Sequence, residues 1–110
     1  MSLAKVYPML VAKAERKGRT AEEVYAVTTH LTGYDAKSIR SLLETDISYG
    51  DFFTNAPGLH TGWETFKGSV CGVKVENVEE PLMKQIRILD KLVDDLAKGK
   101  SMGKILGSLK

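Results

Sequence analysis

The chain has 110 residues, 43% hydrophobic and 27% charged, with a formal net charge of +2, so we expect a single domain over residues 1–110. No apolar run approaches the roughly 20 residues of a membrane span and no signal peptide is visible, so no membrane partner is expected. The single cysteine excludes an internal disulfide and a cysteine-cluster zinc site, and favours a cytoplasmic location.

The first 31 residues predict two helices. Pro8 suits the first position of a helix that carries Leu10 and Ala14 inward, and Gly18 closes it. Thr20 and Glu23 then form a capping box, in which the threonine side chain accepts from a backbone N–H and the glutamate reaches back. We expect the second helix to run to about Leu31.

Capping residues also mark two further helices. Gly33 ends the second helix, and Asp35 is typical of the cap of a third, which carries Ile39 and neighbouring leucines. Ser48 and Asp51 form a weaker capping box, which predicts a short helix through Phe53.

The stretch that follows is richer in glycine and proline. Residues 55–69 indicate a surface loop held by Trp63 and Phe66. Residues 70–75 contain β-branched side chains and predict a single short extended segment, for which no partner strand is evident.

Residues 79–100 give the clearest helical pattern. Pro81 suits the first helical position and Gly99 the left-handed position that ends a helix. One face is apolar and the other is expected to be polar, with Asp95 among its charged residues; Asp94 and Lys98 form a favourable pair one turn apart. Ser101 is expected to cap a final helix. The predicted fold is all-α: an orthogonal multi-helix bundle around one long C-terminal helix, with a short β element near 70–75.

Much of this sequence resembles a bacterial family, domain of unknown function 2200. The resemblance rests on eight stretches: Val6-Tyr7-Pro8, KAERKGRT (13–20), LTGY (31–34), Phe52-Phe53 with Ala56-Pro57, VCGV (70–73), EPLM (80–83), Ile86-Arg87 and LDKLVDDLAKGK (89–100). It implies a small, mainly helical cytoplasmic protein of bacteria and supplies no activity, ligand or catalytic residue.

Nucleic-acid binding is one hypothesis. Residues 1–40 carry seven basic and four acidic side chains, residues 41–95 five and ten, and residues 96–110 four and none. The second and third helices, with Gly33 in the turn, have the dimensions of a helix-turn-helix. Helix three would then offer Lys37 and Arg40 to the major groove, while the phosphates would be contacted by Arg16, Lys17 and Arg19. Two helices of an ordinary bundle explain the same pattern, and that interpretation is favoured.

A protein partner or a homo-oligomer is the other hypothesis. Aromatic side chains anchor interfaces, so Trp63 and Phe66 form a candidate partner surface if they are exposed, and part of the core if they are not. The hydrophobic spacing of residues 79–100 covers only two heptads, which is short for a coiled coil.

No catalytic, metal or cofactor site is predicted. Cys71 would be a nucleophile only with a histidine beside it, and a buried cysteine acting as a small hydrophobe explains it better. His30 and His60, with Asp35 or Asp51, show no metal-ligand spacing. We therefore expect a non-enzymatic binding or interaction module, with a helix-turn-helix-like nucleic-acid binder as the alternative and an enzyme using Cys71 third.

Overall fold

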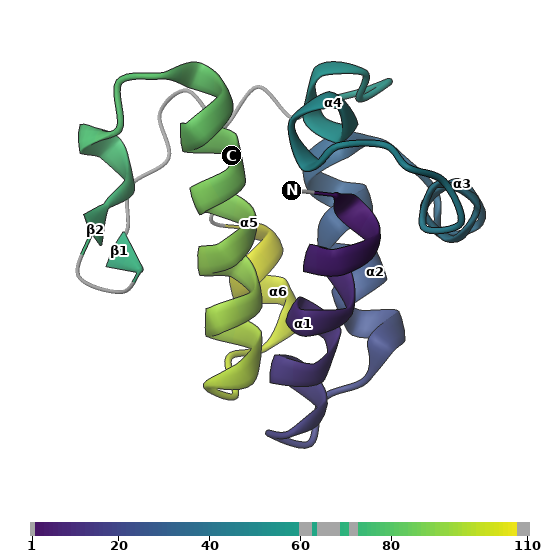
Figure 1. Cartoon of the computed structure of the whole chain (residues 1–110). Coiled ribbons are helices and arrows are strands. Elements are labelled where there is room, and N and C mark those ends of the chain that lie inside the picture. Colours follow the sequence, from purple (N-terminus) through teal and green to yellow (C-terminus); the bar gives the residue numbers. More distant parts are fainter. Residues whose placement is uncertain (1, 60–62, 64–68, 71–72, 108–110) are drawn as a thin grey trace.

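The longest helix, α5 (Pro81–Ala97), packs against elements from both sides of it in the sequence (Figure 1). The computed structural model describes residues 2–59, 63, 69–70 and 73–107. The other elements are α1 (Leu3–Glu15), α2 (Ala21–Thr32), α3 (Ala36–Leu42), α4 (Tyr49–Thr54), β1 (Ser69–Val70), β2 (Val73–Lys74), the 3₁₀ helix η2 (Val75–Asn77) and α6 (Met102–Gly107).

Both ends of α5 are where the sequence places them. Pro81 is the first helical residue, and Gly99 adopts a φ of 91° after the last turn. The N–H of Gly99 donates to the carbonyl of Leu96 and that of Lys100 to the carbonyl of Asp95, so two carbonyls left over at the helix end find donors. Asp94 and Lys98 form the expected ion pair, at 2.9 Å.

The polar face of α5 is narrower than the sequence analysis expects, because Asp95 is buried. Its side chain accepts from Lys91 at 2.8 Å and lies 3.4 Å from the ammonium of Lys100. Asp95 follows Leu92 by three residues and Ile88 by seven, which places it on the buried side of a helix. The assignment of Asp95 to the exposed face was therefore wrong.

The sequence predicts that Pro8 opens the first helix, and this prediction was wrong. Pro8 lies inside α1, which begins at Leu3. A proline in a helix interior costs about 3 kcal/mol, since its N–H is missing and its ring meets the preceding turn. Leu3, Val6 and Tyr7 are all buried, and each contributes about 1.5–3 kcal/mol. Their burial outweighs the cost of the proline, and the helix extends past it.

The start of α2 is the predicted capping box. The Thr20 hydroxyl accepts from the N–H of Glu23, and the Glu23 carboxylate accepts from the N–H of Thr20. Near the other end, Thr28 is fully buried and its hydroxyl lies 2.8 Å from that of Tyr7 on α1. Threonine has a low helix propensity, so packing is what holds Thr28 in the helix.

Position 33, at the end of α2, requires glycine for two separate reasons. Its φ is 83°, which side chains with a Cβ rarely adopt, and a Cβ there would lie 2.6 Å from the backbone nitrogen of Gly58. The N–H of Gly58 donates to the carbonyl of Thr32, so the segment after α4 is joined to the end of α2. Asp35 and Ser48 cap α3 and α4 as predicted, each accepting from a backbone N–H three residues on.

The β element is a hairpin rather than a single extended segment. β1 and β2 are antiparallel, with Val70 opposite Val73 and Ser69 opposite Lys74. The expectation that no partner strand exists was wrong because the partner is the other half of the same stretch, reached after two residues.

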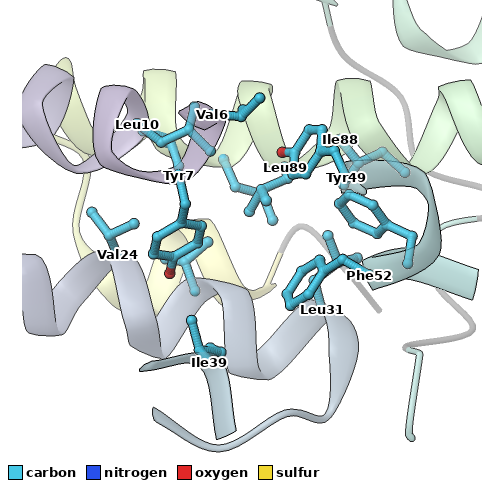
Figure 2. Packing of buried hydrophobic residues seen from close by; sticks show 14 of the residues in the cluster. Val6, Tyr7, Leu10, Val24, Leu31, Ile39, Tyr49, Phe52, Ile88 and Leu89 are labelled. Atoms are coloured by element: carbon cyan, nitrogen blue, oxygen red, sulfur yellow. The ribbon is translucent and has the colours of Figure 1, made fainter. Parts of the chain in front are cut away.

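The buried side chains of α1, α2, α4 and α5 meet in one core (Figure 2). Helices α1, α2 and α5 contact one another along their lengths, whereas α3 is seen nearly end-on when α5 runs down the view (Figure 1). The all-α fold around a long C-terminal helix is therefore confirmed. Within the described ranges, none of the helices combines the length and apolar character needed to cross a bilayer.

Candidate functional site

A hollow of about 420 Å³ opens where α1, α4 and α5 meet. We call it the Tyr49 hollow. Its lining residues are Val6 from α1, Ser48, Tyr49 and Gly50 from the start of α4, and Met83, Ile86, Arg87 and Asp90 from α5. Pockets of 300 to 1,000 Å³ with a mostly apolar wall and a few polar groups are typical ligand sites.

Tyr49 is one of the lining residues, but its hydroxyl oxygen is enclosed by the fold and is not open to the hollow. The side chain is only 5% exposed, and its ring packs edge-on against Phe53 with centroids 5.2 Å apart. Figure 2 shows the ring reaching from α4 toward Ile88 and Leu89 of α5. The oxygen is buried without a hydrogen-bond partner in the described part of the protein. Burial, and then the negative charge of Asp90, raise the pKa of Tyr49 far above its usual value, so the group stays a neutral hydroxyl.

The two charged residues of the lining are Asp90 and Arg87. Burial raises the pKa of the Asp90 carboxyl, and the charges of Arg87 and Lys13 partly oppose that rise. Lys13 itself pairs with Asp94 at 3.1 Å, one turn further along α5. Among the residues that the structure describes, neither Asp90 nor Arg87 has an ion pair or a hydrogen bond from its side chain. Both therefore keep capacity for a ligand.

Two methionines are the exposed large hydrophobic side chains of the described chain. Met83, 39% exposed, lines the hollow, and Met9, 65% exposed, is one turn after Val6 on α1. Methionine is flexible and polarizable, and is common on surfaces that accept varied partners.

A second hollow, of about 400 Å³, lies between α2, α3 and α6. Its lining is Glu22, Tyr25, Ala26, Thr29, His30, Ala36, Arg40 and Leu106. The Arg40 guanidinium stands over the Tyr25 ring, 5.1 Å from its centroid, where a cation and an aromatic face attract each other. We call this second hollow the Arg40 groove.

The basic residues proposed for nucleic acid do not form one surface. Arg40 stands over Tyr25, whereas Lys37 lines a different hollow beside Tyr34 and Ser41. Exposed Arg16 and Lys17 lie at the α1–α2 turn, at the end of the molecule away from α4 (Figure 1).

Arg19 is already engaged within the fold. Its Nε donates to the Glu23 carboxylate at 3.0 Å and its Nη1 to the carbonyl of Lys100 at 2.9 Å. The hydrogen bond from Arg19 is also the main reason that the pKa of Glu23 is lowered.

The predicted aromatic surface is described only at Trp63. This side chain is half-buried and packs against the core. Phe66, Cys71 and His60 lie outside the described residues, and His30 lines the Arg40 groove. No group of three histidine, cysteine or acidic side chains suited to a metal occurs within the described ranges.

Sequence reasoning missed the Tyr49 hollow altogether. Arg87 and Asp90 were placed together on the polar face of the long helix, which is correct but does not single them out. Tyr49 follows the Ser48 cap directly, and nothing local indicates that its hydroxyl would be buried without a partner. Only the approach of α4 to α5, about forty residues apart in sequence, creates that arrangement.

The structure defines a small, mainly helical protein with several surface hollows among its described helices. The chain matches, over residues 1–107, the family described as uncharacterized protein conserved in bacteria (DUF2200), and it belongs to that family. This confirms the resemblance seen in the sequence.

A solved structure carries the same fold. The crystal structure of the uncharacterized protein SP1917 is similar with a TM-score of 0.91 and 48% sequence identity, over 97% of this chain and 88% of that one. No curated protein matched the chain.

Proposed function

We propose that this protein is a non-enzymatic binding module of the bacterial cytoplasm, and that a partner occupies the Tyr49 hollow. The observation that carries the proposal is the largely apolar lining of this hollow, which includes the exposed side chain of Met83. Pockets of this size with a mostly apolar wall and a few polar groups are typical binding sites.

The surroundings of the hollow support the same proposal. Met83 at its wall and Met9 nearby expose apolar surface that a partner would cover. Asp90 and Arg87 add one acceptor group and one donor group that the fold leaves available.

The state of the hydroxyl favours binding over catalysis. A general base or nucleophile works best with a pKa near the working pH, whereas burial moves the pKa of Tyr49 upward, away from neutrality. Tyr49 is thus not suited to transfer its proton. The single cysteine of the chain suits a reducing compartment such as the cytoplasm.

The second candidate, a helix-turn-helix-like nucleic-acid binder, draws on one observation. Lys37 and Arg40 are both exposed on α3, the second helix of the pair. The dispersal of the other basic residues gives it less support than the hollow gives a protein partner.

One experiment separates the two candidates. Tagged protein is used to capture partners from bacterial lysate, with half of each sample treated with nuclease. Two variants act as controls for each other: Met83→Ala in the hollow, and Lys37→Ala with Arg40→Ala on α3.

We expect a protein partner that survives nuclease, is retained by the α3 variant and is lost by the hollow variant. Equal capture by the hollow variant would remove the hollow from the function. Retained nucleic acid that is lost with the α3 variant, and falls steeply as salt rises, would establish the second candidate instead.

A further inference from the structure

Two turns, the one after α1 and the one after α5, lie at the same end of the molecule, away from α4 (Figure 1). Arg19 joins them, because its Nη1 donates to the carbonyl of Lys100 at 2.9 Å. We call this region, residues 13–19 and 91–100, the basic end.

Three carboxylates in or beside the basic end are outnumbered by the cations that pair with them. The pairs are Lys13 and Lys98 with Asp94, Lys91 and Lys100 with Asp95, and Arg19 with Glu23. Five cations therefore face three carboxylates, which leaves two positive charges over.

Arg16 and Lys17 add two more positive charges. Both are exposed, and in the described part of the chain neither side chain makes an ion pair or a hydrogen bond. They follow Lys13 by three and four residues, which brings the three side chains to one face. Together these three residues form the described lining of a hollow of about 530 Å³, which shares no residue with the Tyr49 hollow.

Two features could offset this charge, and neither does so at the hollow. Glu15 is exposed and is not part of the described lining, since adjacent residues of a helix face different sides. The last carbonyls of α1 carry the negative end of its dipole, but those of Ala14 and Glu15 already accept from N–H groups of residues 17–19. The hollow therefore keeps its surplus of positive charge.

We propose that the basic end binds the oligophosphate part of a small molecule, with the terminal phosphate in the hollow between Lys13, Arg16 and Lys17. The Arg16 guanidinium donates to two phosphate oxygens, and the two ammonium groups reach the third. The next phosphate lies toward Lys98, whose ammonium binds the same Asp94 carboxylate as Lys13 and is 64% exposed. This proposal does not depend on the Tyr49 hollow.

A terminal phosphate fits three converging cations better than a carboxylate does. It has three free oxygens around one centre and a charge of about −2, whereas a carboxylate has two oxygens in one plane and a charge of −1. A single exposed ion pair changes affinity by at most about fivefold. A chain of phosphates contacts several of these cations at once, so we expect it to bind more tightly than one phosphate.

Four probes test the anion chemistry. Inorganic tripolyphosphate and adenosine triphosphate carry the oligophosphate, adenosine monophosphate carries one terminal phosphate, and citrate carries carboxylates only. Each is titrated into the full ¹⁵N-labelled chain at low salt without divalent cations. The shifts of the backbone amides at 13–19 and 98–100 give the dissociation constants.

We expect tripolyphosphate to bind at least threefold more tightly than adenosine monophosphate or citrate. Arg16→Ala with Lys17→Ala should weaken its binding about tenfold, as the loss of two ion pairs implies. Lys37→Ala with Arg40→Ala removes the same charge from exposed positions on α3 and should weaken it less than twofold. Circular dichroism checks that both variants keep the helical fold.

The two oligophosphate probes distinguish the source of the group. Equal affinity for tripolyphosphate and adenosine triphosphate would support the proposal with the phosphates alone recognised. Tighter binding of adenosine triphosphate would support it with a nucleotide as the ligand. Citrate binding as tightly as tripolyphosphate, equal losses in the two variants, or no shifts at 13–19 would overturn the proposal.

Discussion

Tyr34 donates its hydroxyl to the carbonyl oxygen of Phe52 across 2.8 Å, and the two rings stack with centroids 4.6 Å apart. Tyr49, three residues before Phe52 on the same helix, has a buried hydroxyl that donates to nothing in the described chain. The same chemical group therefore stabilises the fold at one position and costs free energy at the other.

Replacing these two tyrosines by phenylalanine should move stability in opposite directions. Tyr34→Phe leaves the Phe52 carbonyl without its donor and should lower the free energy of unfolding by about 1 kcal/mol. Tyr49→Phe removes an unpaired buried oxygen and should raise it by about 1 kcal/mol. Urea unfolding followed by circular dichroism measures both, and a loss of stability in Tyr49→Phe would mean that the hydroxyl is paired after all.

Gly33→Ala should destabilise the protein by about 3 kcal/mol. The left-handed backbone costs an alanine about 1–2 kcal/mol, and the Cβ must also push the Gly58 backbone away. Gly18→Ala is the matched control, because its φ is 84° but nothing lies within 4 Å of the added Cβ. Its loss should be no more than about 1–2 kcal/mol in the same unfolding experiment. Equal losses would show that the approach of Gly58 contributes nothing.

Asp95→Ala should cost about 3 kcal/mol, since it leaves the largely buried ammonium of Lys91 without its partner. Lys98→Ala removes one end of a more exposed pair with Asp94 and should cost at most about 1 kcal/mol. Thermal unfolding of both variants at the same pH makes the comparison. Similar melting temperatures for the two would argue against a special role for the buried pair.

Asp90→Asn should stabilise the protein at neutral pH. Because the pKa of Asp90 is raised in the folded state, the folded protein binds a proton more tightly than the unfolded chain, and stability falls as pH rises through that interval. Asp94 and Glu23 have lowered pKa values and act in the opposite sense, so their contribution is lost as pH falls.

The difference between wild type and Asp90→Asn isolates the single carboxyl. The gain in melting temperature should be largest at neutral pH and should shrink below the ordinary pKa of 3.8, where both side chains are neutral. A gain that does not vary with pH would assign the effect to packing rather than to charge.

The helix boundaries were the part of the fold that local chemistry could predict. Thr20, Asp35 and Ser48 each accept from a backbone N–H within three residues, so the signal and its partner lie in the same short segment. The helix start predicted from Pro8 was wrong because the burial of the side chains before it stabilises a helix that begins earlier.

The candidate site could not be predicted in the same way. Tyr49 and Asp90 come together through the packing of α4 on α5, and no local pattern records whether a hydroxyl finds a partner there. Asp95 is a different case, since its spacing from Ile88 and Leu92 already placed it on the buried face. The hydrophobic pattern was sufficient to predict that Asp95 is buried, and the residue was assigned to the exposed face only because it is charged.

The central place of α5 has a consequence for synthesis in the cell. Its apolar face covers α1, α2 and α4, yet it is translated after all of them. About eighty residues separate the end of α1 from the end of α5, which takes on the order of ten seconds to translate. During that time Leu3, Val6 and Leu10 lack one of the helices that pack against α1, so the nascent chain keeps apolar surface exposed until α5 is complete.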